Sequence, residues 1–193
     1  MPEVTRSGVP QTELHRHLDV ALRTSTLLEL AQARGLVPHS TSLERFRDEI
    51  LIRRPLKDLH EVLAQFTLFQ KVQDRPETLE RVAFEAVEDC RAEGTHVAEL
   101  RFSPSFVAEH SRLGWNEILD AYSRGLSREL AAYPEMKAGL ICIATRDYGV
   151  DSVAETAEFY LRNHDRLIAF DLAGNEAGFP CRDFAGALQK RFG

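Results

Sequence analysis

The sequence predicts an α/β protein that forms about the first four strands of a (β/α)₈ barrel, with a large helical insertion after the first strand. Short apolar runs alternate with helical patterns in the second half of the chain, as in βαβ units with a parallel sheet. Glu99 and Arg101 share one face of such a run. Buried charges need partners, and the polar mouth of a barrel would provide them. The alternative is that this strand lies at a solvent-exposed edge of the sheet, where its charges need no partner. Barrels of this class carry their sites at the carboxyl ends of the strands, where this sequence has His17, Asp19, Ser103, Arg146 and Gly174.

The first predicted strand covers residues 12–19 and holds the most informative pattern in the chain. Because successive side chains of a strand point to opposite faces, His15, His17 and Asp19 project the same way. Two imidazoles at this spacing can hold one divalent metal ion, and imidazole suits zinc. Asp19 would then orient a substrate or support the ligands. The alternative is that both histidines are ordinary strand residues. Arg16 falls on the face of the strand that packs against helices. The only explanation the sequence offers is that its side chain snorkels, so that the charged end reaches solvent.

Helical patterns fill the next part of the chain, far beyond what a crossover between two parallel strands needs. Thr24 or Ser25 can begin a helix that ends at Gly35, and a short helix is predicted over 43–50. Apolar residues at helical spacing predict a longer helix over 56–71. A proline in the first turn opens another, over 75–94.

A regular alternation follows, with strands predicted over 97–103, 138–144 and 167–173. Helices are predicted over 115–132, 153–162 and 182–190. A complete barrel has eight strands and about 250 residues, and this chain has four predicted strands in 193 residues. We therefore expect one domain over residues 1–193, truncated before a fifth strand. Its open edge would either be covered by the rest of a longer protein or mediate self-association.

Composition limits the classes of protein that this chain can represent. The chain is 44% hydrophobic and 28% charged, as expected of a globular protein with a real core. It has no apolar run long enough to span a membrane, and Met1–Pro10 lacks the apolar centre of a signal peptide. A net charge of −6 argues against nucleic-acid binding. We interpret the three cysteines as buried thiols of a cytoplasmic protein.

Three segments resemble one known family, in the order in which that family carries them. Glu13–Asp19 (ELHRHLD) resembles the first-strand signature of the adenosine deaminase family, within the metal-dependent amidohydrolases. Val97–Pro104 (VAELRFSP) resembles its second strand, and Phe170–Glu176 (FDLAGNE) resembles its fourth. The resemblance covers nearly the whole chain from Glu13 onward and implies a TIM barrel.

The resemblance implies a zinc enzyme that acts on a purine nucleoside. In that family a zinc-activated water replaces the 6-amino group of the purine, so that adenosine and water give inosine and ammonia. His15 and His17 match Zn²⁺ ligands, whereas His17, Asp19 and Gly174 match substrate contacts, with Asp19 on the sugar hydroxyls. Leu59, Leu63 and Phe66 resemble the apolar lid that covers the pocket in this family. The alternative is that these residues simply belong to the core side of a helix.

The resemblance places no catalytic residue within this chain. The third histidine ligand, the proton-shuttling glutamate, a further histidine and an aspartate ligand of the family would follow Gly193, so the chain alone should be nearly inactive. Val20 replaces a usual glycine, and a β-branched residue there would resist positive φ and could crowd the pocket floor. Two alternatives remain: a deaminase of another 6-aminopurine compound, such as adenine or a modified nucleoside, and a non-catalytic half-barrel that binds a partner.

Five other histidines have no second potential metal ligand at a spacing in the sequence that is typical of metal sites. We interpret them as surface or capping residues: His39, His60, His96, His110 and His164.

Overall fold

Four parallel strands form one sheet in the order in which they occur along the chain, in a computed structural model that describes residues 11–193. The strands are β1 (Gln11–His17), β2 (Thr95–Phe102), β3 (Lys137–Thr145) and β4 (Leu167–Ala173). Each strand pairs in parallel with the next, which confirms the predicted sheet. The prediction for Met1–Pro10 concerns residues outside the described part.

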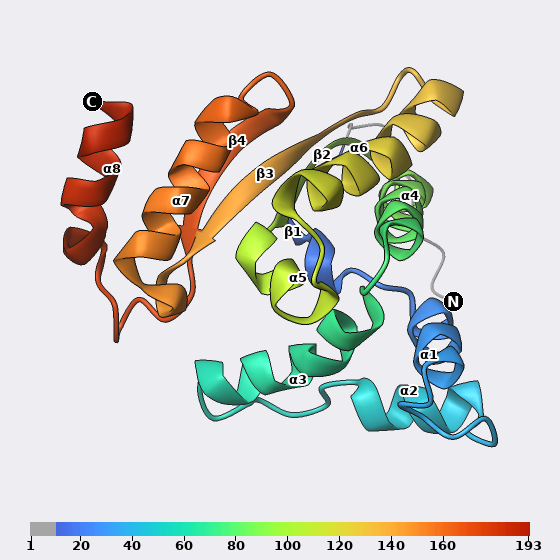
Figure 1. Ribbon diagram of the computed structural model, residues 1–193. Coiled ribbons are helices and arrows are strands. Elements are labelled where there is room, and N and C mark those ends of the chain that lie inside the picture. Colours follow the sequence, from blue (N-terminus) through green and yellow to red (C-terminus); the bar gives the residue numbers. More distant parts are fainter. Residues whose placement is uncertain (1–10) are drawn as a thin grey trace.

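The helices divide into a layer on the sheet and a group at one end of it (Figure 1). Helices α4, α6 and α7 pack against the strands, α8 lies beside α7, and α3 contacts the turn after β1. None of the helices described is both long and apolar enough to cross a membrane. Their bounds are α1 (Thr24–Ala33), α2 (Leu43–Ile50), α3 (Leu59–Val72), α4 (Pro76–Ala92), α5 (Pro104–Ser111), α6 (Trp115–Ala132), α7 (Gly149–Arg162) and α8 (Ala185–Phe192).

Most predicted elements are confirmed, and the differences have local causes. Helix α3 begins at Leu59, three residues later than predicted, because the Asp58 carboxylate accepts the Glu61 N–H at 3.0 Å and caps the helix there. Helix α5 was not predicted, although Ser103 caps it and Pro104 occupies its first turn. Helix α7 begins four residues earlier than predicted, and α8 follows a 3₁₀ segment at Cys181–Phe184.

The first strand ends before Asp19, so the prediction of a strand over residues 12–19 is wrong at its end. Leu18–Val20 forms a 3₁₀ turn instead. Leu18 is fully buried in the main core, and the turn directs the chain away from the sheet toward α1. Val20 has no positive φ in this turn, so its β-branched side chain meets no backbone strain.

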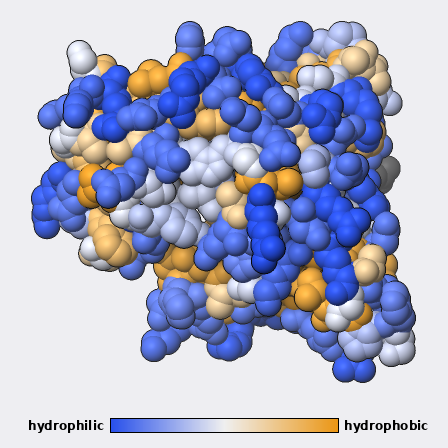
Figure 2. Space-filling model, in the orientation of Figure 1, coloured by the Kyte–Doolittle hydropathy of each residue, from blue (hydrophilic) through white to orange (hydrophobic). Residues whose placement is uncertain are grey.

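The largest core cluster lies between the sheet and helices α4 and α6. The Phe102 ring of β2 meets the Tyr122 ring of α6 edge to face, with centroids 5.1 Å apart. A Cβ on Gly125 would lie 2.1 Å from the Glu80 carbonyl oxygen, so this glycine lets the backbones of α6 and α4 pack directly together. Outside the core the surface is mostly hydrophilic, with small apolar patches in the view of Figure 2.

Cys90 and Cys142 are buried as predicted, but Cys181 is exposed. The prediction is wrong for Cys181 because this residue follows β4 in the 3₁₀ segment rather than lying on an element that packs against the sheet. All five of the remaining histidines are exposed, as predicted.

Two arginines on the strands are paired with acidic side chains. Arg101, with only 8% of its surface exposed, donates from Nη1 to Asp171 Oδ2 of β4 at 2.5 Å and from Nη2 to the Leu14 carbonyl oxygen at 3.0 Å. This pairing confirms the prediction for Arg101, whose buried charge has an acidic partner. Arg16 is held by an ion pair rather than by snorkelling, because its Nη2 donates to Glu93 Oε2 at 2.7 Å.

Gln73 joins three parts of the fold with its buried side-chain amide. Its Nε2 donates to the Asp19 carbonyl oxygen at 2.6 Å and to the Phe69 carbonyl oxygen at 3.1 Å. Its Oε1 accepts the Tyr122 hydroxyl at 2.8 Å. Only 1% of Gln73 is exposed, so each of these groups would lose its partner without access to water if the amide were removed.

We therefore expect Gln73→Ala to lower the free energy of unfolding by about 2–4 kcal/mol, since it leaves buried polar groups unpaired and opens a cavity. Urea unfolding followed by circular dichroism measures this change. Gln65→Ala, at an exposed position of α3, the helix that Gln73 directly follows, is the matched control and should change the value by less than about 0.5 kcal/mol. Equal effects of the two substitutions would contradict the role of Gln73.

Candidate functional site

A cavity of about 220 Å³ opens at the carboxyl ends of the four strands. Every strand contributes to its wall, either with its last residues or with the segment that follows, and α3 and α5 complete the wall. The lining residues are His17, Asp19, Leu63, Phe66, Ser103, Phe106, Ile143, Thr145, Asp147, Tyr148, Ala173 and Gly174. Three of the residues expected to contact a substrate, His17, Asp19 and Gly174, are therefore brought together.

Asp19 is the most deeply buried charged residue of this wall. Its Oδ2 accepts the Ser103 N–H at 3.1 Å, and its Oδ1 lies 3.8 Å from His17 Nδ1. Burial raises the pKa of the Asp19 carboxyl to about 7, against the opposing effect of hydrogen bonds from the Ser103 and Asp19 backbone. A carboxyl group of this kind can both donate and accept a hydrogen bond near neutral pH.

His15 and His17 lie side by side at the end of β1, with ring centroids 5.5 Å apart and ring planes inclined by 52°. His15 is exposed and is absent from the cavity wall, whereas His17 is half-buried. Burial, and then the neighbouring charges of His15 and Arg101, lower the pKa of His17, which Asp171 opposes. This favours the neutral imidazole, the form that binds metals. No cluster of three or more His, Cys, Asp or Glu side chains able to hold a metal occurs within residues 11–193.

Hydroxyl groups connect the ends of β2 and β3 at the cavity. Ser103 Oγ lies 2.8 Å from Thr145 Oγ1 and 3.0 Å from Ser105 Oγ. Thr145 was not predicted as a site residue, although it is the last residue of a strand that ends at this edge. That position was the only signal in the sequence.

Gly174 follows β4 with φ +105°, a conformation that favours glycine. A Cβ at this position would lie 2.2 Å from Asp147 Oδ2, which accepts the Asn175 N–H at 2.9 Å. The missing Cβ thus makes room for Asp147 in this structure. Asp147 joins the segment after β3 to the segment after β4.

Tyr148 and Phe106 add two aromatic rings to the wall that the sequence did not single out. The Tyr148 hydroxyl donates to Glu109 Oε2 of α5 at 2.5 Å. Burial and Glu109 raise the pKa of Tyr148, so the phenol stays protonated and donates. This hydrogen bond connects the segment after β3 to α5 at the mouth of the cavity.

Helix α3 contributes only part of the predicted lid. Leu63 and Phe66 line the cavity, but Leu59 is 41% exposed and lies outside the wall. Val20 also lies outside this wall and borders a separate hollow along β1. His15 and His17 line the same hollow, so the expected effect of Val20 on the site stays a prediction.

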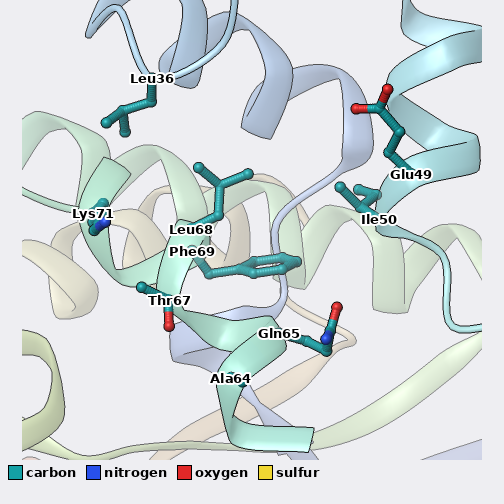
Figure 3. A pocket seen from close by; sticks show the side chains of 9 residues that line it. All are labelled: Leu36, Glu49, Ile50, Ala64, Gln65, Thr67, Leu68, Phe69 and Lys71. Atoms are coloured by element: carbon teal, nitrogen blue, oxygen red, sulfur yellow. The ribbon is translucent and has the colours of Figure 1, made fainter. Parts of the chain in front are cut away.

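A second cavity, of about 360 Å³, lies on the other side of α3 and is larger than the first (Figure 3). Leu36, Ile50, Leu68 and Phe69 surround it, together with residues of α2 and α3. None of the predicted site residues lines this cavity. The smaller cavity is the better candidate, because polar side chains from the ends of β1, β2 and β3 converge there.

The family model described as "Adenosine deaminase" matches residues 10–190. The chain belongs to the adenosine deaminase family. Adenosine deaminase from Klebsiella pneumoniae is 34% identical over 174 residues, which cover 90% of this chain and 52% of that protein. The enzyme from Erwinia tasmaniensis is 35% identical over 178 residues, which cover 92% of this chain and 53% of that protein. This family member spans about half the length of the curated relatives it matches.

Solved structures of larger proteins share its fold. An adenine deaminase from Arthrobacter aurescens superimposes with a TM-score of 0.80 at 20% identity, over 94% of this chain and 54% of that one. An amidohydrolase from Burkholderia ambifaria with bound Zn superimposes with a TM-score of 0.77 at 23% identity, over 95% of this chain and 49% of that one. An N6-methyl-AMP deaminase from Arabidopsis thaliana superimposes with a TM-score of 0.73 at 28% identity, over 95% of this chain and 54% of that one. The four strands thus correspond to part of a (β/α)₈ barrel, as predicted.

Gly174→Ala should lower the free energy of unfolding by about 1–3 kcal/mol, since the new Cβ adopts a strained conformation and collides with the Asp147 carboxylate. Gly186→Ala is the matched control in α8, because a Cβ there meets nothing within 4 Å. It should change the value by less than about 1 kcal/mol. Urea unfolding of both variants decides the question, and a loss in Gly186→Ala as large as in Gly174→Ala would refute the steric argument.

Proposed function

We propose that this chain provides the metal-binding and nucleoside-binding half of a zinc-dependent aminohydrolase that converts adenosine and water to inosine and ammonia. The observation that carries the proposal is the position of Asp19 in the cavity, 3.8 Å from a histidine of the His15–His17 pair. The family match over residues 10–190 and the adenosine deaminase relatives support it.

The residues present fit zinc as two of its ligands. His15 and His17 would hold the ion, because their rings are adjacent at the end of β1 and burial favours the neutral form of His17. When bound, zinc would lower the pKa of a water molecule and so supply a nucleophile at neutral pH. Since catalytic zinc sites usually have three protein ligands, further ligands from outside residues 11–193 would complete this one.

Asp19 would bind the sugar of the nucleoside. Its Oδ2 is fixed by the Ser103 N–H, which leaves Oδ1 on the cavity side beside His17. A buried carboxyl with a pKa of about 7 can accept a hydrogen bond from a ribose hydroxyl or donate one to it. Adenine, the alternative substrate, would leave this buried group without a sugar partner, so a sugar-bearing purine is favoured.

The apolar part of the wall suits the purine ring. Leu63, Phe66 and Phe106 line one side of the cavity, and Gly174 with Ala173 offers backbone without a large side chain on another. A planar base between these groups would exclude water from its faces, which strengthens each polar contact at its edge.

The charges of the wall favour a nucleoside over a nucleotide. The wall contains two acidic side chains, Asp19 and Asp147, and no arginine or lysine among the residues that form it. The two nearby arginines do not line the cavity: Arg101 donates to Asp171 and Leu14, and Arg146 donates to the Phe179 carbonyl oxygen and Cys181 Sγ, while the buried Nε of each has no described partner. A phosphate would therefore meet negative charge without a cationic partner.

Zinc binding by the purified chain tests the proposed ligands. Titration calorimetry should show binding that His15→Ala and His17→Ala each weaken by at least about tenfold. His39→Ala, at an exposed position away from β1, should leave the affinity unchanged. Unchanged zinc affinity in both β1 variants would exclude them as ligands. The zinc-loaded chain should release no ammonia from adenosine, and measurable turnover would contradict the need for further ligands.

Binding of three unreactive ligands tests the substrate class. Purine riboside should bind the chain more tightly than purine, and its 5′-monophosphate should bind at least about tenfold more weakly than the riboside, because the wall is acidic. Asp147→Asn should reduce the penalty on the monophosphate. Tighter binding of the monophosphate than of the riboside would favour a nucleotide deaminase. No binding of any of the three would favour a half-barrel that binds another partner.

A further inference from the structure

Tyr148 contributes its aromatic ring to the wall of the cavity. It lies between the end of β3 and the start of α7, where it closes a 3₁₀ turn, and 38% of its surface remains exposed. Its ring lines the cavity with those of Phe66 and Phe106. An aromatic ring that borders a cavity contributes a large apolar surface to whatever binds there.

The hydroxyl of Tyr148 is already engaged, so the ring is the part left to contact a ligand. The Tyr148 hydroxyl donates to Glu109 Oε2, and this hydrogen bond holds the donor in one orientation.

Glu109 belongs to an element that is itself fixed. Helix α5 carries both Glu109 and Phe106, and the buried Gln70 side chain of α3 donates to the Phe106 carbonyl oxygen at 3.1 Å. The aromatic wall is therefore connected from α3 through α5 to the segment after β3. The Tyr148–Glu109 bond adds to the Ser103–Thr145 contact, which joins the cap residue of α5 to the end of β3.

We infer that Tyr148 is a specificity-determining residue whose ring packs against the purine, and that Glu109 is the positioning residue that holds this ring in place. The inference rests on the proposed function and identifies a residue pair that acts on nucleoside binding. It assigns Glu109, in the last turn of α5, to ligand recognition although Glu109 itself does not line the cavity.

The affinity for purine riboside, measured by titration calorimetry on the full 193-residue chain, tests the pair. Tyr148→Ala should raise Kd about tenfold, because the aromatic contact is lost. Tyr148→Phe and Glu109→Ala should each raise Kd about threefold to tenfold, because the ring is no longer held. Their combination should be no worse than either alone. Glu109→Gln keeps an acceptor for the hydroxyl and should restore the affinity to within about threefold of the unaltered chain.

Glu135→Ala is the matched control for loss of an exposed carboxylate, and it should leave Kd unchanged. Thermal unfolding of every variant separates the roles, since a purely structural bond would lower Tm without changing Kd. Unchanged Kd in Tyr148→Ala, or fully additive effects in the double variant, would overturn the inference while leaving nucleoside binding intact. Absence of binding by the unaltered chain would refute the nucleoside site itself, and the inference with it.

Discussion

The backbone and side chain of Asp19 together fix the end of β1, and the rest of the site depends on this attachment. The carboxylate accepts the N–H of Ser103 at the end of β2, and the carbonyl oxygen accepts the amide of Gln73 at the end of α3. One residue thus sets the distance between two strand ends and the helix that covers them. Because both contacts are buried, neither is weakened by competition with water.

Periodicity and capping residues were sufficient to predict the sheet and most helices, because these depend on local apolar spacing. The bounds of α2, α6 and β4 show this. Helix α5 could have been predicted from Ser103 and Pro104. The contacts of Gln73 with Asp19 and Tyr122 could not, since they join residues 54 and 49 positions apart. The same holds for Tyr148 and Glu109, which are 39 positions apart.

The candidate site has a polar side and an apolar side, which come from different elements of the fold. Histidines and a buried carboxyl occupy the end of β1, whereas aromatic and aliphatic groups come from α3, α5 and the segment after β3. His17 and Asp19 were predictable because they are close in sequence. The apolar side was not, because helix core and cavity wall have the same composition, and only tertiary structure distinguishes Leu63 and Phe66 from Leu59.

The ion pair between Arg101 and Asp171 has a consequence for the order in which this protein can form on the ribosome. The two residues are 70 positions apart, so at about 5–20 residues per second several seconds pass between their synthesis. During that time the guanidinium of β2 has no carboxylate partner, and burying it alone would be unfavourable. The nascent sheet of β1, β2 and β3 should therefore stay loosely packed, and become firm only once β4 leaves the exit tunnel.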